Sequence, residues 1–429
     1  MRWLSILEEF VDKILLAMVL LVIMVSPACA DSLLLQNAKV VDPKNRSITT
    51  RNILILDGRI ANEEKKNGET YRTIDLTGKW IIPGLIDLHV HCGGNPLPNG
   101  KYEDLGPEKT AKKMLYSGVC AYLDLFYGNF AEIFRARNLQ RTESRKHRDE
   151  SDIYCAGTGF GNWNLKNDPR AEVESYIERW KPDVIKLIYG RGSLDRPTLA
   201  KAVKGATNKG VKTVVHIGSW EHAQDAIECG ATAVTHFFDD EVIPNHVLHA
   251  WSKSKAISIP TMAVQSDMAN FTLKPILLRS PLLREMEPPA ALTAYLDRKR
   301  FSKKAAETLK WQQEDMQNNF KSFKKLADAH VQILAGSDTG NQGTFQGFSL
   351  HREIKLMQDA GFSPWDALAA GTTKAAEFLG RPSGINSGDT AELVILDANP
   401  IQDIANTQRI SAVIHHGCLV DRSSLVPSR

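Results

Sequence analysis

This chain of 429 residues has few cysteines, a small net charge and few long hydrophobic runs. Its six cysteines have no regular spacing, which excludes a small protein built on a disulfide framework. The formal net charge is only +3, and no basic stripe is interleaved with aromatic residues, so we expect no nucleic-acid partner. An apolar run, Ile14–Val25, falls short of the about 20 residues that a membrane-spanning helix needs, so no stable membrane span is expected in the mature chain.

The apolar run is instead typical of a targeting segment. Ser26-Pro27 interrupts it, and Ala28-Cys29-Ala30 has the small-x-small form of a signal-peptidase site. We therefore predict that residues 1–30 are a signal peptide and that the mature chain is exported, to the periplasm or the extracellular space. The first residues carry more acid than a signal peptide usually has, so a retained membrane anchor stays the alternative.

The middle of the chain alternates short apolar runs with helical stretches, a pattern that favours βαβ units and a parallel sheet. Eight such units close into a (β/α)₈ TIM barrel, which we place over residues 81–380. The predicted strands are Ile81–Val90, Val119–Leu125, Asp152–Ala156, Val184–Ile188, Thr213–Ile217, Ala233–Phe237, Ile257–Met262 and Val331–Ala335.

The two ends of the chain differ from the middle, because both are rich in short strands and turns. Residues 31–80 include a hairpin signal at Asp57-Gly58, and residues 381–429 end in "AELVILD" and "ISAVIHHGCLVD". We predict that the two segments join in a small β-sandwich beside the barrel, giving an α/β chain with two domains. The longest connection between strands, residues 263–332, could form a lid over the barrel mouth.

The stretch "WIIPGLIDLHVHCGG" places two histidines one residue apart at the end of an apolar strand. His89 and His91 then point to the same face, about 6.6 Å apart along the strand, and can meet on one metal ion. The alternative is a pair of core histidines, each bonded to the backbone. The choice depends on whether other strands supply further ligands.

Further polar residues occur at or near the ends of the later apolar strands. Because barrel enzymes build their sites at the carboxyl ends of the strands, these residues should meet His89 and His91 at one mouth. They are Lys186, His216, His236 and Asp338.

This set resembles that of the amidohydrolase superfamily, and "SLHREIKLMQDAGFSPWDALAAGTTKAAEFLG" followed by "ELVILDANP" is similar to its imidazolonepropionase-related, prolidase-like branch. The resemblance implies a hydrolase with two divalent metal ions, for which Zn²⁺ suits the ligand types. It also implies that CO₂ converts Lys186 into a carbamate that bridges both ions. The metal ligands that the resemblance implies are His89, His91, Lys186, His216, His236 and Asp338.

The implied reaction is hydrolysis of a C–N amide bond in a small molecule, either a dipeptide, as in prolidases, or an N-acyl amino acid. A metal-bridging hydroxide would attack the carbonyl, and Asp338 is the catalytic candidate that takes its proton and passes it to the leaving nitrogen. Tyr189 and Arg191 follow Lys186 and could bind a substrate carbonyl or carboxylate, or only shape the rim. Association into a homo-oligomer stays open.

Three alternatives remain. A mononuclear deaminase of the same superfamily usually carries a Glu three residues after the histidine equivalent to His216, where this chain has Ser219. A cyclic-amide hydrolase similar to imidazolonepropionase fits export poorly, because histidine breakdown is an internal pathway. A non-catalytic metal-binding barrel would leave the candidate proton shuttle Asp338 without a purpose.

Overall fold

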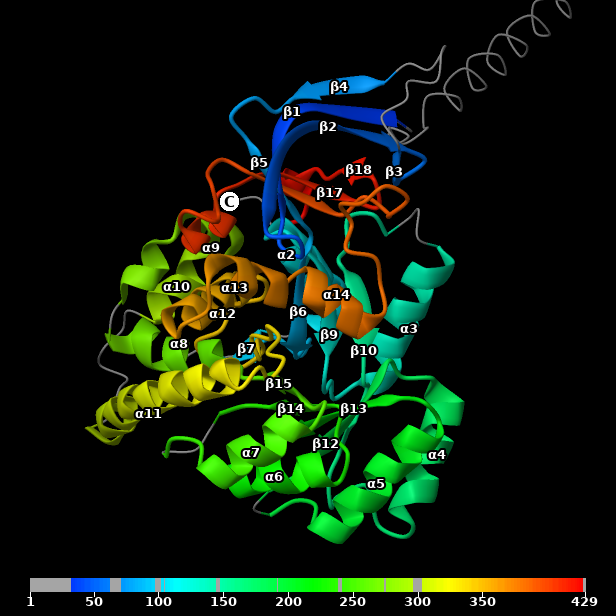
Figure 1. Cartoon of the computed structure of the whole chain (residues 1–429), viewed down its shortest axis with the longest axis vertical. Helices are drawn as coiled ribbons and strands as arrows, with labels where there is room; N and C mark the ends of the chain where they lie inside the picture. The colour runs from blue at the N-terminus through cyan, green and yellow to red at the C-terminus, as the bar shows by residue number, and fades with distance from the viewer. Residues whose placement is uncertain are drawn as a thin grey trace, which may run out of the picture.

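The computed structural model describes residues 32–61, 71–96, 102–103, 105–143, 147–190, 192–237, 241–273, 275–295 and 303–426. A β-sheet lies at one end of the molecule, and the barrel with its helices occupies the rest (Figure 1). The predicted signal peptide, residues 1–30, lies outside the described residues. Within the described ranges, no helix combines the length and the apolar character needed to cross a membrane.

Parallel strands form the predicted barrel. One set pairs in the order β10-β9-β6 and the other in the order β11-β12-β13-β14-β15. Their short apolar sequences are almost entirely buried, as expected of strands covered on both faces. The strands are β6 (Leu85–Val90), β9 (Val119–Asp124), β10 (Asp152–Cys155), β11 (Gly159–Phe160), β12 (Val184–Ile188), β13 (Lys212–His216), β14 (Ala233–Thr235) and β15 (Ile257–Ile259).

Two of the predicted strands need correction. The apolar run 81–90 is divided: β5 (Trp80–Pro83) pairs in the terminal sheet, and only β6 enters the barrel. The division falls at Gly84, whose N–H donates to Glu392 of the terminal sheet, whereas the next N–H donates to Gly118 beside the barrel. The eighth strand, predicted at 331–335, is reduced to single parallel bridges, Ser258 with Ile333 and Val90 with Thr339, which still close the barrel.

Helices follow most strands and cover the barrel. Several begin at a side chain that caps the first turn, as at Asp168, Asp195, Ser219 and Ser363. Buried apolar side chains on their inner faces complete the core, with Trp220 and Trp251 among the largest. The helices are α2 (Gly106–Tyr116), α3 (Phe130–Thr142), α4 (Pro169–Trp180), α5 (Arg196–Asn208), α6 (Trp220–Glu228), α7 (Asn245–Lys253), α12 (Phe348–Asp359), α13 (Pro364–Ala370) and α14 (Thr373–Leu379).

The two ends of the chain join in one terminal β-domain, as predicted. Its strands pair in a single eight-stranded sheet with the order β18-β17-β16-β5-β1-β2-β3 and β4 beside β1, where the sequence analysis expected a sandwich. The junction is antiparallel: β16 pairs with β5, with Leu393 opposite Pro83. The remaining strands are β1 (Ser32–Asp42), β2 (Ser47–Leu56), β3 (Arg59–Ala61), β4 (Arg72–Asp75), β16 (Leu393–Leu396), β17 (Ile410–His415) and β18 (Cys418–Leu419).

The described part of segment 263–332 is helical. Leu282, Leu283 and Met286 pack with Leu115 of α2, so this part rests against the barrel helices and the terminal sheet. Its closure over substrate stays a prediction. The segment contains α8 (Met262–Leu273), η2 (Pro275–Arg279), α9 (Pro281–Met286), α10 (Pro289–Ala294) and α11 (Lys303–Asp328). The remaining short elements are β7 (Asn95–Pro96), β8 (Tyr102–Glu103), η4 (Ile404–Gln408) and η5 (Arg422–Ser424).

Candidate metal centre

The strand β6 brings alternate polar residues to the inside of the barrel. Asp87 and His89 are fully buried, and His91 follows in the loop, with 23% of its side chain exposed. The centroids of the two imidazoles are 5.2 Å apart, so the His-x-His pair is a pair of neighbours on one face, as the strand period requires.

Three of the histidines are held through the same ring nitrogen. His89 Nδ1 lies 2.8 Å from the Thr235 hydroxyl, and His236 Nδ1 lies 2.8 Å from the Thr261 hydroxyl. His91 Nδ1 lies 2.9 Å from the carbonyl oxygen of Phe126, which can only accept, so the proton of a neutral His91 resides on Nδ1. Such contacts fix each ring and leave Nε2 for a metal ion, an arrangement typical of metal-ligating histidine.

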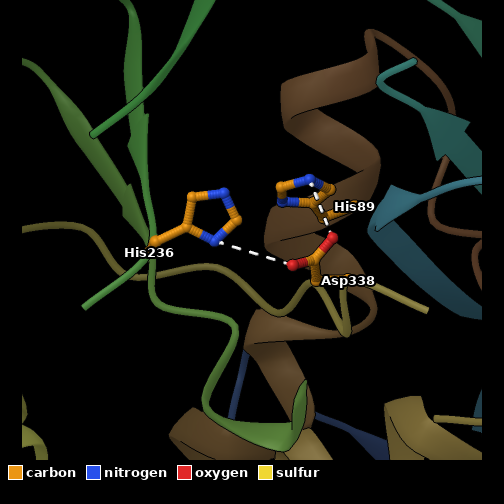
Figure 2. Close-up of side chains that lie close together, drawn as sticks. All are labelled: His89, His236 and Asp338. Carbon is orange, nitrogen blue, oxygen red and sulfur yellow. Dashed lines mark ion pairs between the residues drawn. The ribbon is translucent and has the colours of Figure 1, made fainter. Parts of the chain in front are cut away.

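Asp338 lies among these rings. Its Oδ1 is 3.0 Å from His91 Nε2 and 3.4 Å from His89 Nε2, and its Oδ2 is 3.8 Å from His236 Nδ1. Figure 2 shows the carboxylate next to both rings, with dashed lines that mark its ion pairs with His89 and His236. One ligand atom from each of these three residues lies within 4.8 Å of the others, close enough for one ion. His216 completes the group, with its ring centroid 4.3 Å from that of His236.

Lys186 enters the same space from β12 and is 2% exposed. Its Nζ lies 3.4 Å from His89 Nε2, so it faces an imidazole. Burial lowers the pKa of Lys186 to about 7, against the attraction of Asp338 and Asp124. A substantial fraction of this lysine is therefore a neutral amine at neutral pH.

Burial also keeps most of the imidazoles neutral. Burial and the nearby Lys186 lower the pKa of His89 well below its ordinary value and that of His216 to about 3. For His236, burial and His216 lower the pKa well below the ordinary value. At His91 burial acts in the same direction, but the hydrogen bond and charge of Asp338 outweigh it and raise the pKa. Neutral imidazoles, a carboxylate and an uncharged amine are donors that suit a divalent ion.

Asp87 is a supporting residue that the sequence analysis missed. Its Oδ1 accepts from the backbone N–H of His89 at 3.1 Å and of Ser337 at 2.9 Å, and its Oδ2 accepts from the Ser337 hydroxyl at 2.6 Å. It therefore ties the first histidine to the loop that carries Asp338. The signal was available, since Asp87 precedes His89 by two residues and shares its face of the strand.

Asn341 is a second residue that sequence reasoning missed. Its side-chain amide donates to Asp338 Oδ1 at 3.0 Å and to the Asp338 carbonyl at 2.9 Å. This contact fixes the carboxylate while Asp338 and His236 adopt positive φ of 54° and 85°. Non-glycine residues in that conformation are uncommon and gather at functional sites. No sequence pattern predicts a positive φ at these two residues.

The two predicted substrate residues differ in how far the structure describes them. The Tyr189 hydroxyl donates to Asp225 of α6 at 2.6 Å, and its ring lies against His222, with centroids 5.0 Å apart. Tyr189 is thus engaged with α6, and its role in substrate binding stays a prediction. Arg191 lies outside the described residues.

A cavity of about 450 Å³ opens beside this cluster. Phe126, at its wall, is 39% exposed, an unusual exposure for a large apolar side chain. The cavity joins the cluster through His91 and Asn341. Its lining residues are His91, Gly93, Gly94, Phe126, Tyr127, Gly128, Asn129, Gly340 and Asn341.

Comparison with known proteins gives matches over most of the chain. The family model described as "Amidohydrolase family" matches residues 80–420. The dihydroorotase of Streptococcus pneumoniae serotype 4 is 42% identical over 170 residues, which is 36% of each chain. The chain spans 14% of the length of the dihydroorotase of Desulfotalea psychrophila and 36% of that of Streptococcus pneumoniae.

Solved structures match over greater lengths at lower identity. A Xaa-Pro dipeptidase with bound methionine superposes with a TM-score of 0.69 at 18% identity, over 90% of this chain and 99% of that one. Molinate hydrolase superposes with a TM-score of 0.72 at 18% identity, over 94% and 97%. At such identities the likeness supports the fold.

Proposed function

We propose that this chain, which belongs to the amidohydrolase family and is a hydrolase acting on C–N bonds, cuts the amide bond of a dipeptide or an N-acyl amino acid. Two divalent ions, Zn²⁺ by preference, would take part in the reaction. The observation that carries the proposal is the buried group of imidazoles around Asp338 and Lys186, at the carboxyl ends of the barrel strands and beside a cavity.

The residues present fit a pair of ions. His89, His91 and Asp338 are close enough to hold one, and His216 and His236 stand together on the neighbouring strands to hold the other. We propose that Lys186, as its carbamate, links the two, because a buried neutral amine can capture CO₂ and the resulting anion suits a place between cations. Ions held here would lower the pKa of a water and polarise the substrate carbonyl.

Asp338 is the group that we propose to move the proton. Its Oδ2 lies 3.8 Å from Nδ1 of His236, whereas its Oδ1 is held by Asn341 and His91. One oxygen can therefore stay fixed while the other receives a proton from the attacking water and delivers it to the leaving nitrogen. Asn341 would preserve this orientation through the exchange.

The substrate class rests on the solved neighbours and the cavity. The Xaa-Pro dipeptidase supports a dipeptide, and the cavity wall of Phe126 and Tyr127 suits an apolar side chain. A cyclic amide is the second candidate, favoured by the local 42% identity to a dihydroorotase. The test is a screen of the metal-loaded enzyme on dipeptides with and without proline, N-acyl amino acids, cyclic amides and aminopurines. Release of ammonia from the aminopurines alone would instead identify a deaminase.

We also propose that the enzyme acts outside the cytoplasm, after removal of residues 1–30. The apolar run and Ala28-Cys29-Ala30 support this proposal. N-terminal sequencing of the chain recovered from a secreting host should begin at Asp31, and an intact N-terminus in the membrane fraction would indicate an anchor.

A further inference from the structure

A second group of ligating side chains lies where the terminal sheet meets the barrel. Asp152 begins β10, so it sits at the amino end of the barrel strands, opposite the candidate metal centre. His415 ends β17 of the terminal sheet, and His416 follows it. One ligand atom from each of these three residues lies within 4.8 Å of the others.

One carboxylate orients both imidazoles. Glu392 is 3% exposed, and its Oε2 lies 2.6 Å from His415 Nδ1, while its Oε1 is 3.5 Å from His416 Nδ1. Glu392 Oε1 also accepts from the backbone N–H of His416 at 3.2 Å. With both Nδ1 atoms facing a carboxylate, both Nε2 atoms are directed to Asp152. A carboxylate behind a histidine is the support that zinc ligands commonly have.

His415 supplies an independent sign of a ligand. The residue is 0% exposed, yet its Nε2 has no hydrogen-bond partner in the described part of the chain, and its nearest ion-pair contact is Asp152 Oδ1 at 3.9 Å. A buried ring nitrogen without a partner is costly, and buried polar atoms are nearly always satisfied. A metal ion between His415 and Asp152 would satisfy it.

The distances agree with a zinc ion. Bonds of about 2.0–2.2 Å to nitrogen and oxygen place neighbouring ligand atoms of a tetrahedron about 3.3 Å apart. Asp152 Oδ1 is 2.9 Å from His416 Nε2 and 3.9 Å from His415 Nε2, on either side of this value. Shifts of about half an ångström would therefore complete the geometry. About a quarter of the side chains of Asp152 and His416 is exposed, which leaves an entry path and room for water.

The charge of the surroundings favours a cation. The carboxylates of Asp152 and Glu392 face a single buried guanidinium, that of Arg381, which is 3.0 Å from Asp152 Oδ2 and 3.7 Å from Glu392 Oε1. Arg381 thus occupies the other oxygen of Asp152 and leaves Oδ1 to the imidazoles.

The backbone holds His416 firmly. His416 and Gly417 form the turn between β17 and β18, with φ of 49° and 76°. A Cβ on Gly417 would lie 2.2 Å from the Cα of Gly58, so this turn rests directly on the turn between β2 and β3 and only glycine fits. The ligand positions are therefore built into the sheet before any ion binds.

We propose that Asp152, His415 and His416 form a zinc site that ties the terminal sheet to the amino end of the barrel. The site is separate from the candidate metal centre, and its ligands come from β10, from the last residue of β17 and from the turn after β17.

The test is zinc counting on the full chain, wild type against His416→Gln and His415→Gln, by atomic emission after equilibration with Zn²⁺. Each variant should bind one zinc ion fewer per chain than the wild type, and added Zn²⁺ should raise the Tm of the wild type more than that of either variant. The matched control is His246→Gln with His249→Gln, an exposed i, i+3 pair on α7, which should leave the stoichiometry unchanged.

Anomalous diffraction at the zinc edge gives a second measurement that does not depend on the folding of any variant. A peak bounded by Asp152, His415 and His416 is expected in zinc-loaded crystals of the wild type. No peak there, or wild-type zinc content in both variants, would overturn the proposal and leave an ordinary ion-pair network. Loss of zinc from the control pair alone would identify adventitious surface binding. The result is independent of whether the candidate metal centre hydrolyses amides.

Discussion

Lys186→Ala separates a two-ion centre from a one-ion centre. If the Lys186 carbamate is a ligand of both ions, its loss removes several kcal/mol of metal-dependent stabilisation of the transition state. At 1.36 kcal/mol per tenfold change, turnover should fall at least about 10²-fold and metal content should fall with it. Short carboxylic acids should restore part of the activity, because they can supply an anion in the vacated space.

A second buried lysine provides the matched control. Lys113 is 6% exposed, and its Nζ lies 3.0 Å from both oxygens of the buried Glu287. Each Lys→Ala change removes three methylenes, about 2.4 kcal/mol at about 0.8 kcal/mol apiece. Lys113→Ala also removes the ammonium that faces the buried carboxylate of Glu287, so the total loss of folding free energy is about 3–5 kcal/mol. Lys113→Ala should therefore be the less stable variant and yet retain metal and turnover.

The assay combines atomic emission, turnover on the substrate found by screening, and denaturant unfolding of both variants. Carbon NMR of the wild type after incubation with ¹³C-bicarbonate should reveal a carbamate signal that Lys186→Ala lacks. If Lys186→Ala keeps both metals and nearly full turnover, the bridging role is wrong. The one-ion alternative, a deaminase, would then become the better assignment.

Three further predictions concern other buried groups. Asp338→Asn should keep much of its metal but lose about 10²–10⁴-fold in turnover, since Asn cannot accept a proton, and turnover close to wild type would remove the shuttle role. Each histidine of the candidate metal centre, replaced singly by alanine, should lose metal and activity together, as measured by atomic emission and turnover; these are His89, His91, His216 and His236. The control His246→Ala on α7 should lose neither. Burial raises the pKa of Glu353 to about 8. The folded chain therefore holds a proton on this carboxyl more tightly than the unfolded chain does. The free energy of unfolding should fall as pH rises from about 4.5 to about 8. The unfolding free energy of Glu353→Gln minus that of the wild type should therefore be larger at about pH 9 than at about pH 6. Equal differences at both pH values would contradict this prediction.

The barrel could be predicted because strands buried on both faces are short apolar runs that stand out between amphipathic helices. The polar residues at the strand ends stood out for the same reason, since a histidine or lysine at the end of an apolar run needs an explanation. The division of 81–90 between two sheets could not be predicted, because both halves are equally apolar and only the partners of Gly84 and its neighbour separate them. The extent of the eighth strand was predicted wrongly, because its pairing in the structure is confined to single bridges.

The supporting residues were harder to predict, because their importance lies in contacts between distant segments. Thr235 and Thr261 hold rings through hydroxyls that look ordinary in the sequence. Asn341 acts through a carboxylate whose backbone has an unusual φ, and no propensity encodes that conformation. Asp87 was within reach, since its strand position places it beside His89.

Buried charge at the two ends of the barrel is balanced in different ways. At the amino end, the carboxylates of Asp152 and Glu392 are held by ion pairs with Arg381 and by the imidazoles of His415 and His416. At the carboxyl end, burial lowers the pKa values of His89, His216, His236 and Lys186, so these groups favour their uncharged forms. His91 is the exception, because Asp338 raises its pKa. Such a group gains little from its own contacts, since uncharged donors attract one another weakly, but it is well prepared for cations. We therefore expect bound metal to stabilise the carboxyl end, because its donors are arranged for ions that the chain alone does not supply; added Zn²⁺ should raise the Tm of the wild type more than that of Asp338→Ala.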